Sequence, residues 1–224
     1  MSDPSGATLD RAAPDTTPPA SVVSSRLLMV RHGESTWNRE QRIQGQLDPP
    51  LTDRGLVQGG EVAERLSGHE VVALYTSDLT RARQTAQLIA EQVGCEPIVV
   101  SWLREIGLGS WEGKTSHDLI EEYPELWHAW AREPSWNLVP GGEGAAAFER
   151  RVNEAVQELF SRHPEGDILC VTHGGVIQVA LGTVVGRASD GIFPFLIENC
   201  SLTVLERITR GMVITAVNDT CHLS

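Results

Sequence analysis

Two apolar, β-prone runs dominate this 224-residue sequence, and each leads into a histidine followed by a glycine. The first run spans 27–30 and precedes His32; the second spans 168–172 and precedes His173. Open α/β sheets bind ligands at the carboxyl ends of their strands, so two strand-terminal histidines that are far apart in sequence can meet there. The sequence therefore predicts one active site assembled from two strand ends, with a histidine pair at its centre.

From residue 26 onward, β-branched or leucine-rich runs alternate with longer helical patterns, which predicts a layered α/β domain. We predict strands over 26–31, 71–76, 97–101, 167–172, 202–208 and 212–217. We predict helices over about 53–67, 79–93, 115–131, 144–162 and 175–186. We expect the last two strands to form a hairpin around Arg210 and Gly211. Thr52 is expected to cap the first helix, and Ser77 or Asp78 the second.

The composition is that of one ordinary globular domain, with 41% hydrophobic and 21% charged residues. A net charge of −12 argues against nucleic-acid or membrane binding, because either partner would favour a basic face. The four cysteines lack a CxxC or metal-ligand spacing, which fits a reduced cytoplasm. We therefore expect a cytoplasmic protein with a small-molecule partner, and the sequence leaves a homodimer open.

Residues 1–25 are rich in Ser, Thr, Pro, Ala and Asp, with no basic start followed by an apolar stretch. They are therefore unlike a signal peptide or a membrane anchor. We expect a disordered N-terminal tail over 1–25 and a single domain over 26–224. The alternative for the tail is an arm that orders against a neighbouring subunit.

His32 is the candidate nucleophile, because a neutral imidazole can attack phosphorus and hold the phosphoryl group covalently. Its neighbours fit this role. Arg31 precedes it, Gly33 lets the backbone approach a ligand closely, and Asn38 can donate an amide hydrogen bond. Arg-His-Gly by itself would also fit a capped turn with a structural histidine.

Arg81 follows the predicted strand 71–76 at the start of a helix, where N–H groups and the helix dipole point into the strand-end crevice. Arg83 lies about 200° around that helix from Arg81, so we expect it on a solvated face. Phosphoryl transfer spreads negative charge over oxygens that fixed donors stabilise. Arg31, Arg81 and His173 fit this task.

The segment 31–38, Arg-His-Gly-Glu-Ser-Thr-Trp-Asn, resembles the signature of the histidine phosphatase superfamily, in the branch of the cofactor-dependent phosphoglycerate mutases and related phosphatases. Further matches follow in the family's order at 51–55, 76–82, 103–105, 111–113 and 172–175. The resemblance covers nearly everything after residue 25. It implies a three-layer αβα sandwich with a mainly parallel central sheet, a phosphohistidine intermediate, and no metal or other cofactor.

The resemblance also implies individual roles. It selects Arg81 over Arg83 as the phosphate clamp. It selects Glu105 as the acid that protonates the leaving alkoxide and later activates water, with Glu112 in the same loop as the alternative.

Ligand contacts of further residues follow from the resemblance. Gln44 and Gly45 are expected to touch the phosphoryl group or nearby substrate oxygens, and the Gly174 amide to lie against the phosphate. His222, near the C-terminus, either closes over the site or is a surface histidine. No HExxH or paired Cys/His spacing predicts a metal site.

The segment 114–142 bears on the choice between hydrolysis and mutase chemistry. Mutases of the family carry a longer, basic insertion here, whereas this segment has only Lys114 and Arg132 as fixed cations. The sequence therefore predicts a metal-independent phosphatase of small phosphorylated metabolites, with phosphoserine, phosphoglycerate-derived and phosphosugar substrates as candidates. The alternatives are a phosphoglycerate mutase and a phosphoester-binding sensor or scaffold. The tryptophans at 111, 127, 130 and 136 either line an apolar entrance or pack together.

Overall fold

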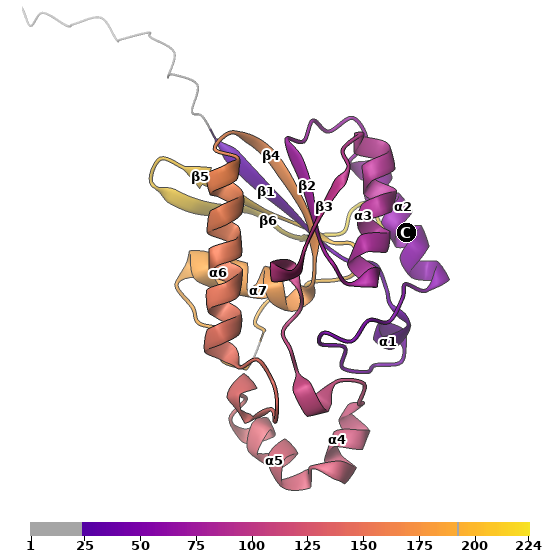
Figure 1. Ribbon diagram of the computed structural model, residues 1–224, viewed down its shortest axis with the longest axis vertical. Helices are drawn as coiled ribbons and strands as arrows, with labels where there is room; N and C mark the ends of the chain where they lie inside the picture. The colour runs from indigo at the N-terminus through magenta and orange to yellow at the C-terminus, as the bar shows by residue number, and fades with distance from the viewer. Residues whose placement is uncertain (1–23, 192) are drawn as a thin grey trace, which may run out of the picture.

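The computed structural model describes residues 24–191 and 193–224 and shows a six-stranded sheet with helices on both faces (Figure 1). The strands are β1 (Ser25–Arg31), β2 (Ala73–Ser77), β3 (Pro97–Val100), β4 (Gly166–Thr172), β5 (Leu202–Ile208) and β6 (Gly211–Asp219). Their order in the sheet is β3-β2-β4-β1-β5-β6. The first four in that order pair in parallel, and β5 pairs antiparallel with both β1 and β6. This arrangement confirms the predicted fold class and the final hairpin.

Helices form the two outer layers and a cap. They are α1 (Thr36–Arg39), α2 (Asp53–Arg65), α3 (Thr80–Val93), α4 (Ser116–Glu122), α5 (Pro124–Arg132), α6 (Ala145–Arg162) and α7 (Gly174–Val185). Short 3-10 turns are η1 (Ser101–Leu103), η2 (Gly109–Trp111) and η3 (Trp136–Leu138). In Figure 1, α4 and α5 lie together beyond the carboxyl ends of the parallel strands. These two helices cap the end of the sheet where the predicted site lies.

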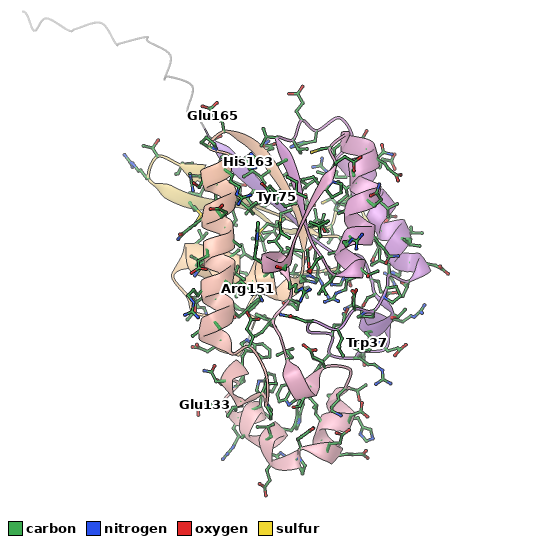
Figure 2. All side chains as sticks on the ribbon, in the orientation of Figure 1. Trp37, Tyr75, Glu133, Arg151, His163 and Glu165 are labelled. Carbon is green, nitrogen blue, oxygen red and sulfur yellow. The ribbon has the colours of Figure 1, made fainter. Side chains whose placement is uncertain are left out.

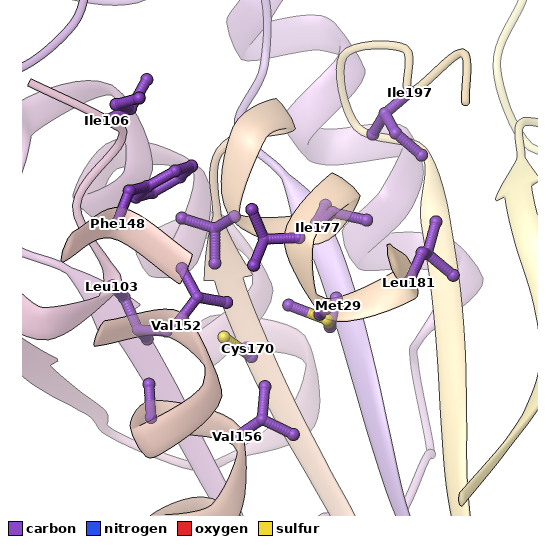
Figure 3. Packing of buried hydrophobic residues seen from close by; sticks show 14 of the residues in the cluster. Met29, Leu103, Ile106, Phe148, Val152, Val156, Cys170, Ile177, Leu181 and Ile197 are labelled. Atoms are coloured by element: carbon purple, nitrogen blue, oxygen red, sulfur yellow. The ribbon is translucent and has the colours of Figure 1, made fainter. Parts of the chain in front are cut away.

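The central strands are buried on both faces because alternate side chains point to opposite helical layers. Met29 of β1 and Cys170 of β4 pack with Phe148 of α6 and Ile177 of α7 (Figure 3). Their neighbours along the strands pack in the second core, against α2 and α3. Each continuous apolar run of the sequence therefore supplies two half-cores, because its alternate residues pack on opposite faces of the sheet.

The β1–β4 pairing sets the position of the site. Ser25–Arg31 pairs residue for residue with Gly166–Thr172, so Arg31 lies opposite Thr172. His32 and His173 consequently leave the same edge of the sheet at the same level, one residue beyond each strand.

One predicted helix, 115–131, is wrong as a single element. The structure divides it into α4 and α5 at Tyr123, which has φ −135° and ψ 53°. The cause is Pro124, which disfavours helical backbone at the residue before it but fits the first turn of α5. The short helix α1 was not among the predicted elements.

One of the two predicted helix caps is confirmed. The Thr52 hydroxyl accepts a hydrogen bond from the Gly55 amide at the start of α2. The prediction for α3 is wrong, because neither Ser77 nor Asp78 caps it. Asp48, from a distant loop, accepts from the Thr80 amide (2.6 Å) and hydroxyl (2.7 Å) instead.

Most of the predicted tail, residues 1–23, lies outside the described residues, whereas Ser25 begins β1. Within the described part of the chain, no helix is long and apolar enough to cross a membrane. Cys95, Cys170, Cys200 and Cys221 are all free thiols.

Replacing Phe148 with Ala tests the packing of α6. Its side chain is completely buried, so Phe148→Ala should lower the free energy of unfolding by about 3–5 kcal/mol through lost burial and a cavity. Urea unfolding measures the loss. The matched control is Val57→Ala on α2, where the side chain is 60% exposed and the change should stay within about 0.5 kcal/mol. Equal effects of the two substitutions would contradict this packing.

Candidate active site

His32 directly follows β1 and is almost fully buried. Its backbone N–H donates to the Thr172 carbonyl (2.9 Å), which ties it to the end of β4. Its Nδ1 lies 2.7 Å from the Gly33 carbonyl oxygen, and because a carbonyl can only accept, Nδ1 carries the proton. Nε2 then accepts the Nε–H of Arg81 at 3.2 Å. The ring is therefore the neutral tautomer with its proton on Nδ1. The lone pair of Nε2 can act as a nucleophile.

Arg81, in the first turn of α3, is completely buried beside this ring. Its Nη1 donates to the Leu47 carbonyl and its Nη2 to the Gly45 carbonyl, both at 2.8 Å. Together with the bond to His32, these contacts fix the plane of the guanidinium. An immobile cation beside the candidate nucleophile is suited to hold phosphate oxygens.

Burial controls the charge states at the site. It lowers the pKa of His32 well below the ordinary 6.5, and the charges of Arg81 and Arg31 lower it further. The pKa of His173 is lowered in the same way, first by burial and then by Arg81. Burial also lowers the pKa of Arg81 to about 10, which leaves the guanidinium charged at neutral pH. Two neutral imidazoles thus face fixed positive charge.

His173 is fully buried between β4 and α7, and its ring centroid lies 5.1 Å from that of His32. Its Nε2 is 2.9 Å from the Ser77 hydroxyl at the end of β2, and that hydroxyl accepts the Leu79 amide. Its Nδ1 is buried without a hydrogen-bond partner among the described residues. Because an unpartnered buried polar atom is costly, this nitrogen is a candidate contact for a bound ligand.

Arg31 supplies the second guanidinium, and burial lowers its pKa. Nη1 donates to the Ile197 carbonyl (2.6 Å), while Nε is buried without a partner in the described chain. A side chain at Gly174 would place its Cβ 3.6 Å from this Nε, so the start of α7 lies close to Arg31. Contact between the Gly174 amide and a phosphate stays a prediction.

The Glu105 carboxylate enters the site from the other side. Its Oε1 accepts the Ile106 amide (2.9 Å) and its Oε2 accepts the Gly175 amide (3.0 Å). A Cβ at Gly175 would lie 2.2 Å from Oε1, so this contact requires glycine. Glu112 Oε1 instead accepts the Gln46 and Leu108 amides and braces the loop. The contacts favour Glu105 over Glu112 as the carboxylate of the site.

A cavity of about 180 Å³ joins Arg31, His32, Arg81 and Glu105, whereas His173 lies against the His32 ring and does not line the cavity. It is lined by Arg31, His32, Ile43, Gln44, Gly45, Arg81, Glu105, Ile106, Leu108 and Phe193. The polar lining residues are part of the predicted set, which also holds His173 and Gly174 outside this lining, and the remaining wall is mostly apolar. The tryptophans at 111, 127, 130 and 136 contact one another instead, with ring centroids 5.5–6.2 Å apart, and do not line this cavity.

Gln44 and Asn38 are held by the turn at Ser35. The Ser35 hydroxyl donates to Gln44 Oε1 (2.8 Å), which leaves the Gln44 amide N–H groups for a ligand. Asn38 Oδ1 accepts the Ser35 amide (3.1 Å) and completes a capping box at α1. Asn38 does not line the cavity.

His222 and Arg83 are placed away from the cavity. His222 Nε2 is 2.9 Å from the Cys200 carbonyl oxygen, and the residue does not line the cavity. Arg83 is an exposed residue of α3 that faces the edge strand β3, as expected for a solvated helix face.

Three contributors escaped the sequence analysis of the site. Ser77 orients His173, and Phe193 forms part of the cavity wall. Asn199 Nδ2 donates to the His32 carbonyl (2.8 Å) and so fixes the backbone of the candidate nucleophile. Only Ser77 carried a sequence signal, because it directly follows the predicted strand 71–76 within a matched motif. The other two reach the site through tertiary contacts.

The arrangement can bind an anion and transfer a group. Two buried guanidiniums and the Glu105 carboxylate line one cavity with a neutral histidine, and the His173 ring, whose Nδ1 has no partner among the described residues, contacts that histidine. This combination suits attack on a phosphoryl group with protonation of its leaving oxygen. Among the residues that the structure describes, no group of three or more His, Cys, Asp or Glu side chains could hold a metal ion.

The known proteins with similar sequences include phosphatases and probable phosphoglycerate mutases. The family model of the histidine phosphatase superfamily (branch 1) matches residues 27–220. The metal-independent phosphoserine phosphatase of Arabidopsis thaliana is 34% identical, over 89% of this chain and 84% of its own. The probable phosphoglycerate mutase GpmB of Serratia proteamaculans is 33% identical, over 88% of this chain and 94% of its own. The solved structure of Bacillus stearothermophilus YhfR has a TM-score of 0.81 with 31% identity, and covers 89% of this chain and 100% of its own.

The buried histidines make stability depend on pH. Because the folded state lowers the pKa of His32 and His173 below the ordinary value, the unfolded chain binds more protons as the pH falls below about 6.5. The unfolding free energy should therefore decrease from about pH 6.5 to 5, by up to about 1.4 kcal/mol per pH unit for each histidine. Urea unfolding in phosphate-free buffer measures this slope. His32→Gln and His173→Gln should each reduce it, and an unchanged slope in both variants would contradict the burial argument.

Proposed function

This chain belongs to the histidine phosphatase superfamily (branch 1) and is a phosphomonoesterase, and we propose that the phosphoryl group passes through His32 on its way to water. The observation that carries this proposal is the His32 tautomer. Its Nδ1–H is held by the Gly33 carbonyl, and Nε2 faces the buried Arg81 within the cavity.

In the first half-reaction, His32 Nε2 attacks phosphorus and the bond to the substrate oxygen breaks. The Nε–H of Arg81, which donates to His32 Nε2 before substrate binds, then donates to a phosphoryl oxygen instead. Arg31 and His173 stabilise the other phosphoryl oxygens. Glu105 donates its proton to the leaving alkoxide, which departs as the alcohol.

In the second half-reaction, the Glu105 carboxylate takes a proton from water as that water attacks the phosphorus bound to His32. Phosphate leaves, the Nε2–phosphorus bond breaks, and the imidazole returns to its neutral form. Glu105 thus ends protonated and ready for the next turnover. Arg31, His32, Arg81 and Glu105 meet at one cavity, and His173 contacts the His32 ring beside it.

Water, and not a second phosphoglycerate, is the proposed acceptor. The two cations of the cap are placed elsewhere, since Lys114 pairs with Glu122 and Arg132 lies at a separate cavity with Glu133. Neither lines the catalytic cavity. A mutase must hold a second anionic group during transfer, and the charges of this cap do not favour that.

The proposed substrates are small phosphorylated metabolites in a reduced cytoplasm. The relative named metal-independent phosphoserine phosphatase supports phosphoserine as the first candidate, and phosphoglycerate-derived and phosphosugar esters are the next. The free thiols support the compartment. Because the outer wall is apolar, with Ile43, Leu108 and Phe193, turnover over a panel of esters is needed to rank them.

Phosphate release from p-nitrophenyl phosphate tests the role of His32. In excess chelator the wild type should retain its activity, because the proposed steps use side chains alone. His32→Ala should reduce release to the background rate, since the covalent intermediate is lost. His117→Ala, at an exposed histidine of α4, is the matched control and should leave the rate unchanged. Turnover by His32→Ala at the wild-type rate would contradict the mechanism.

The second candidate function, phosphoglycerate mutase, is favoured by the relative named GpmB. Incubation with 3-phosphoglycerate and a trace of 2,3-bisphosphoglycerate separates the two activities. We expect free phosphate to accumulate faster than 2-phosphoglycerate forms, because the cap lacks a free cation at the site. Isomerisation without phosphate release would establish the mutase.

A further inference from the structure

Glu105 differs from the two histidines in how its backbone is held. His32 and His173 directly follow paired strands, whereas Glu105 lies in the irregular segment 104–108 between η1 and η2. Backbone amides and carbonyls outside a ladder must find other partners. The position of the Glu105 carboxylate therefore depends on the side chains that bind this segment.

Arg151 of α6 binds the segment through its guanidinium. Nη1 donates to the carbonyls of Trp102 (3.0 Å) and Arg104 (2.8 Å). Nη2 donates to the Glu105 carbonyl (3.3 Å) and to Glu143 Oε2 (2.8 Å), and Nε donates to Glu143 Oε1 (2.8 Å). These contacts use all five N–H donors of an arginine. Figure 2 shows Arg151 on the side of α6 toward the centre of the molecule.

Glu143 holds the same segment on the other side of Glu105. Its Oε2 accepts the Gly107 amide (3.1 Å), and its own backbone amide donates to the Gly107 carbonyl (2.8 Å). The side chains of Arg151 and Glu143 are only 21% and 18% exposed, so water competes weakly for this bidentate pair. Backbone groups on both sides of the acid are thus bound to one ion pair.

We propose that the Arg151–Glu143 ion pair is a positioning clamp that aims the Glu105 carboxylate at the leaving oxygen. The inference rests on the proposed role of Glu105 as general acid. Neither partner lines the cavity, so both act through the backbone that carries Glu105. A lysine at position 151 would keep the charge but lose the planar fork that reaches three carbonyls and a carboxylate.

The leaving group separates a positioning role from a merely structural one. An acidic leaving group such as p-nitrophenol departs without a proton, whereas an alkyl alcohol needs one from the general acid. A displaced Glu105 should therefore slow alkyl esters selectively. A general loosening of the fold would slow both classes equally.

The experiment compares kcat/KM for p-nitrophenyl phosphate and phosphoserine in the full-length enzyme. Arg151→Lys and Glu143→Gln should lose about tenfold or more on phosphoserine and less than about threefold on p-nitrophenyl phosphate, following the pattern of Glu105→Gln. The control Arg162→Met removes an arginine of the same helix whose side chain is 53% exposed, and should match the wild type on both esters. The double variant Arg151→Lys/Glu105→Gln should be no slower on phosphoserine than Glu105→Gln alone.

Equal losses on the two esters in Arg151→Lys, or losses that multiply in the double variant, would overturn the clamp while leaving the role of Glu105 intact. If Glu105→Gln itself slows both esters equally, the proposed acid is wrong and the clamp falls with it. Circular dichroism confirms the fold of each variant. Glu143→Gln, which keeps an oxygen for the Gly107 amide, decides the question if Arg151→Lys does not fold.

Discussion

The in-register parallel pairing of β1 with β4 is the constraint on which the rest of the site depends. It brings the ends of two segments that are about 140 residues apart in sequence to one level of the sheet, so that the His32 amide binds the Thr172 carbonyl and the two imidazoles lie 5.1 Å apart. A slip of one residue in this register would move one histidine to the opposite face. The two apolar half-cores on either side of the strands resist such a slip, because each would then present its side chains to the wrong helical layer.

Burial gives these histidines their chemistry. The same desolvation that lowers the pKa of His32 leaves Arg81 charged, because the ordinary pKa of a guanidinium is so much higher. The site therefore combines a neutral nucleophile with fixed cations, a pairing that water would not preserve. Arg31 Nε and His173 Nδ1 are buried and have no hydrogen-bond partner among the described residues, so both are suited to contact a phosphoryl group.

Sequence reasoning succeeded where the signal is local. β-branched or leucine-rich runs predicted all six strands, and a strand end before each histidine predicted where the pair would meet. It failed where a contact is tertiary. Asp48 caps α3 from a remote loop, and Arg151 reaches the Glu105 segment from a helix about 45 residues later. The division at Pro124 was available from the sequence, because proline restricts the residue before it. The residues next to His222 in the sequence do not indicate that its ring contacts the Cys200 carbonyl, so this position could not be predicted.

The most direct test of this account is to locate the phosphoryl group during turnover. The wild-type enzyme is mixed with a phosphomonoester, quenched within milliseconds under alkaline conditions that preserve phosphohistidine, and digested for mass spectrometry. Phosphate is expected on the peptide that contains His32, bound to its imidazole, and on no other peptide. Phosphate on a different residue, or turnover with an unmodified His32 peptide at every quench time, would contradict the covalent role of this histidine.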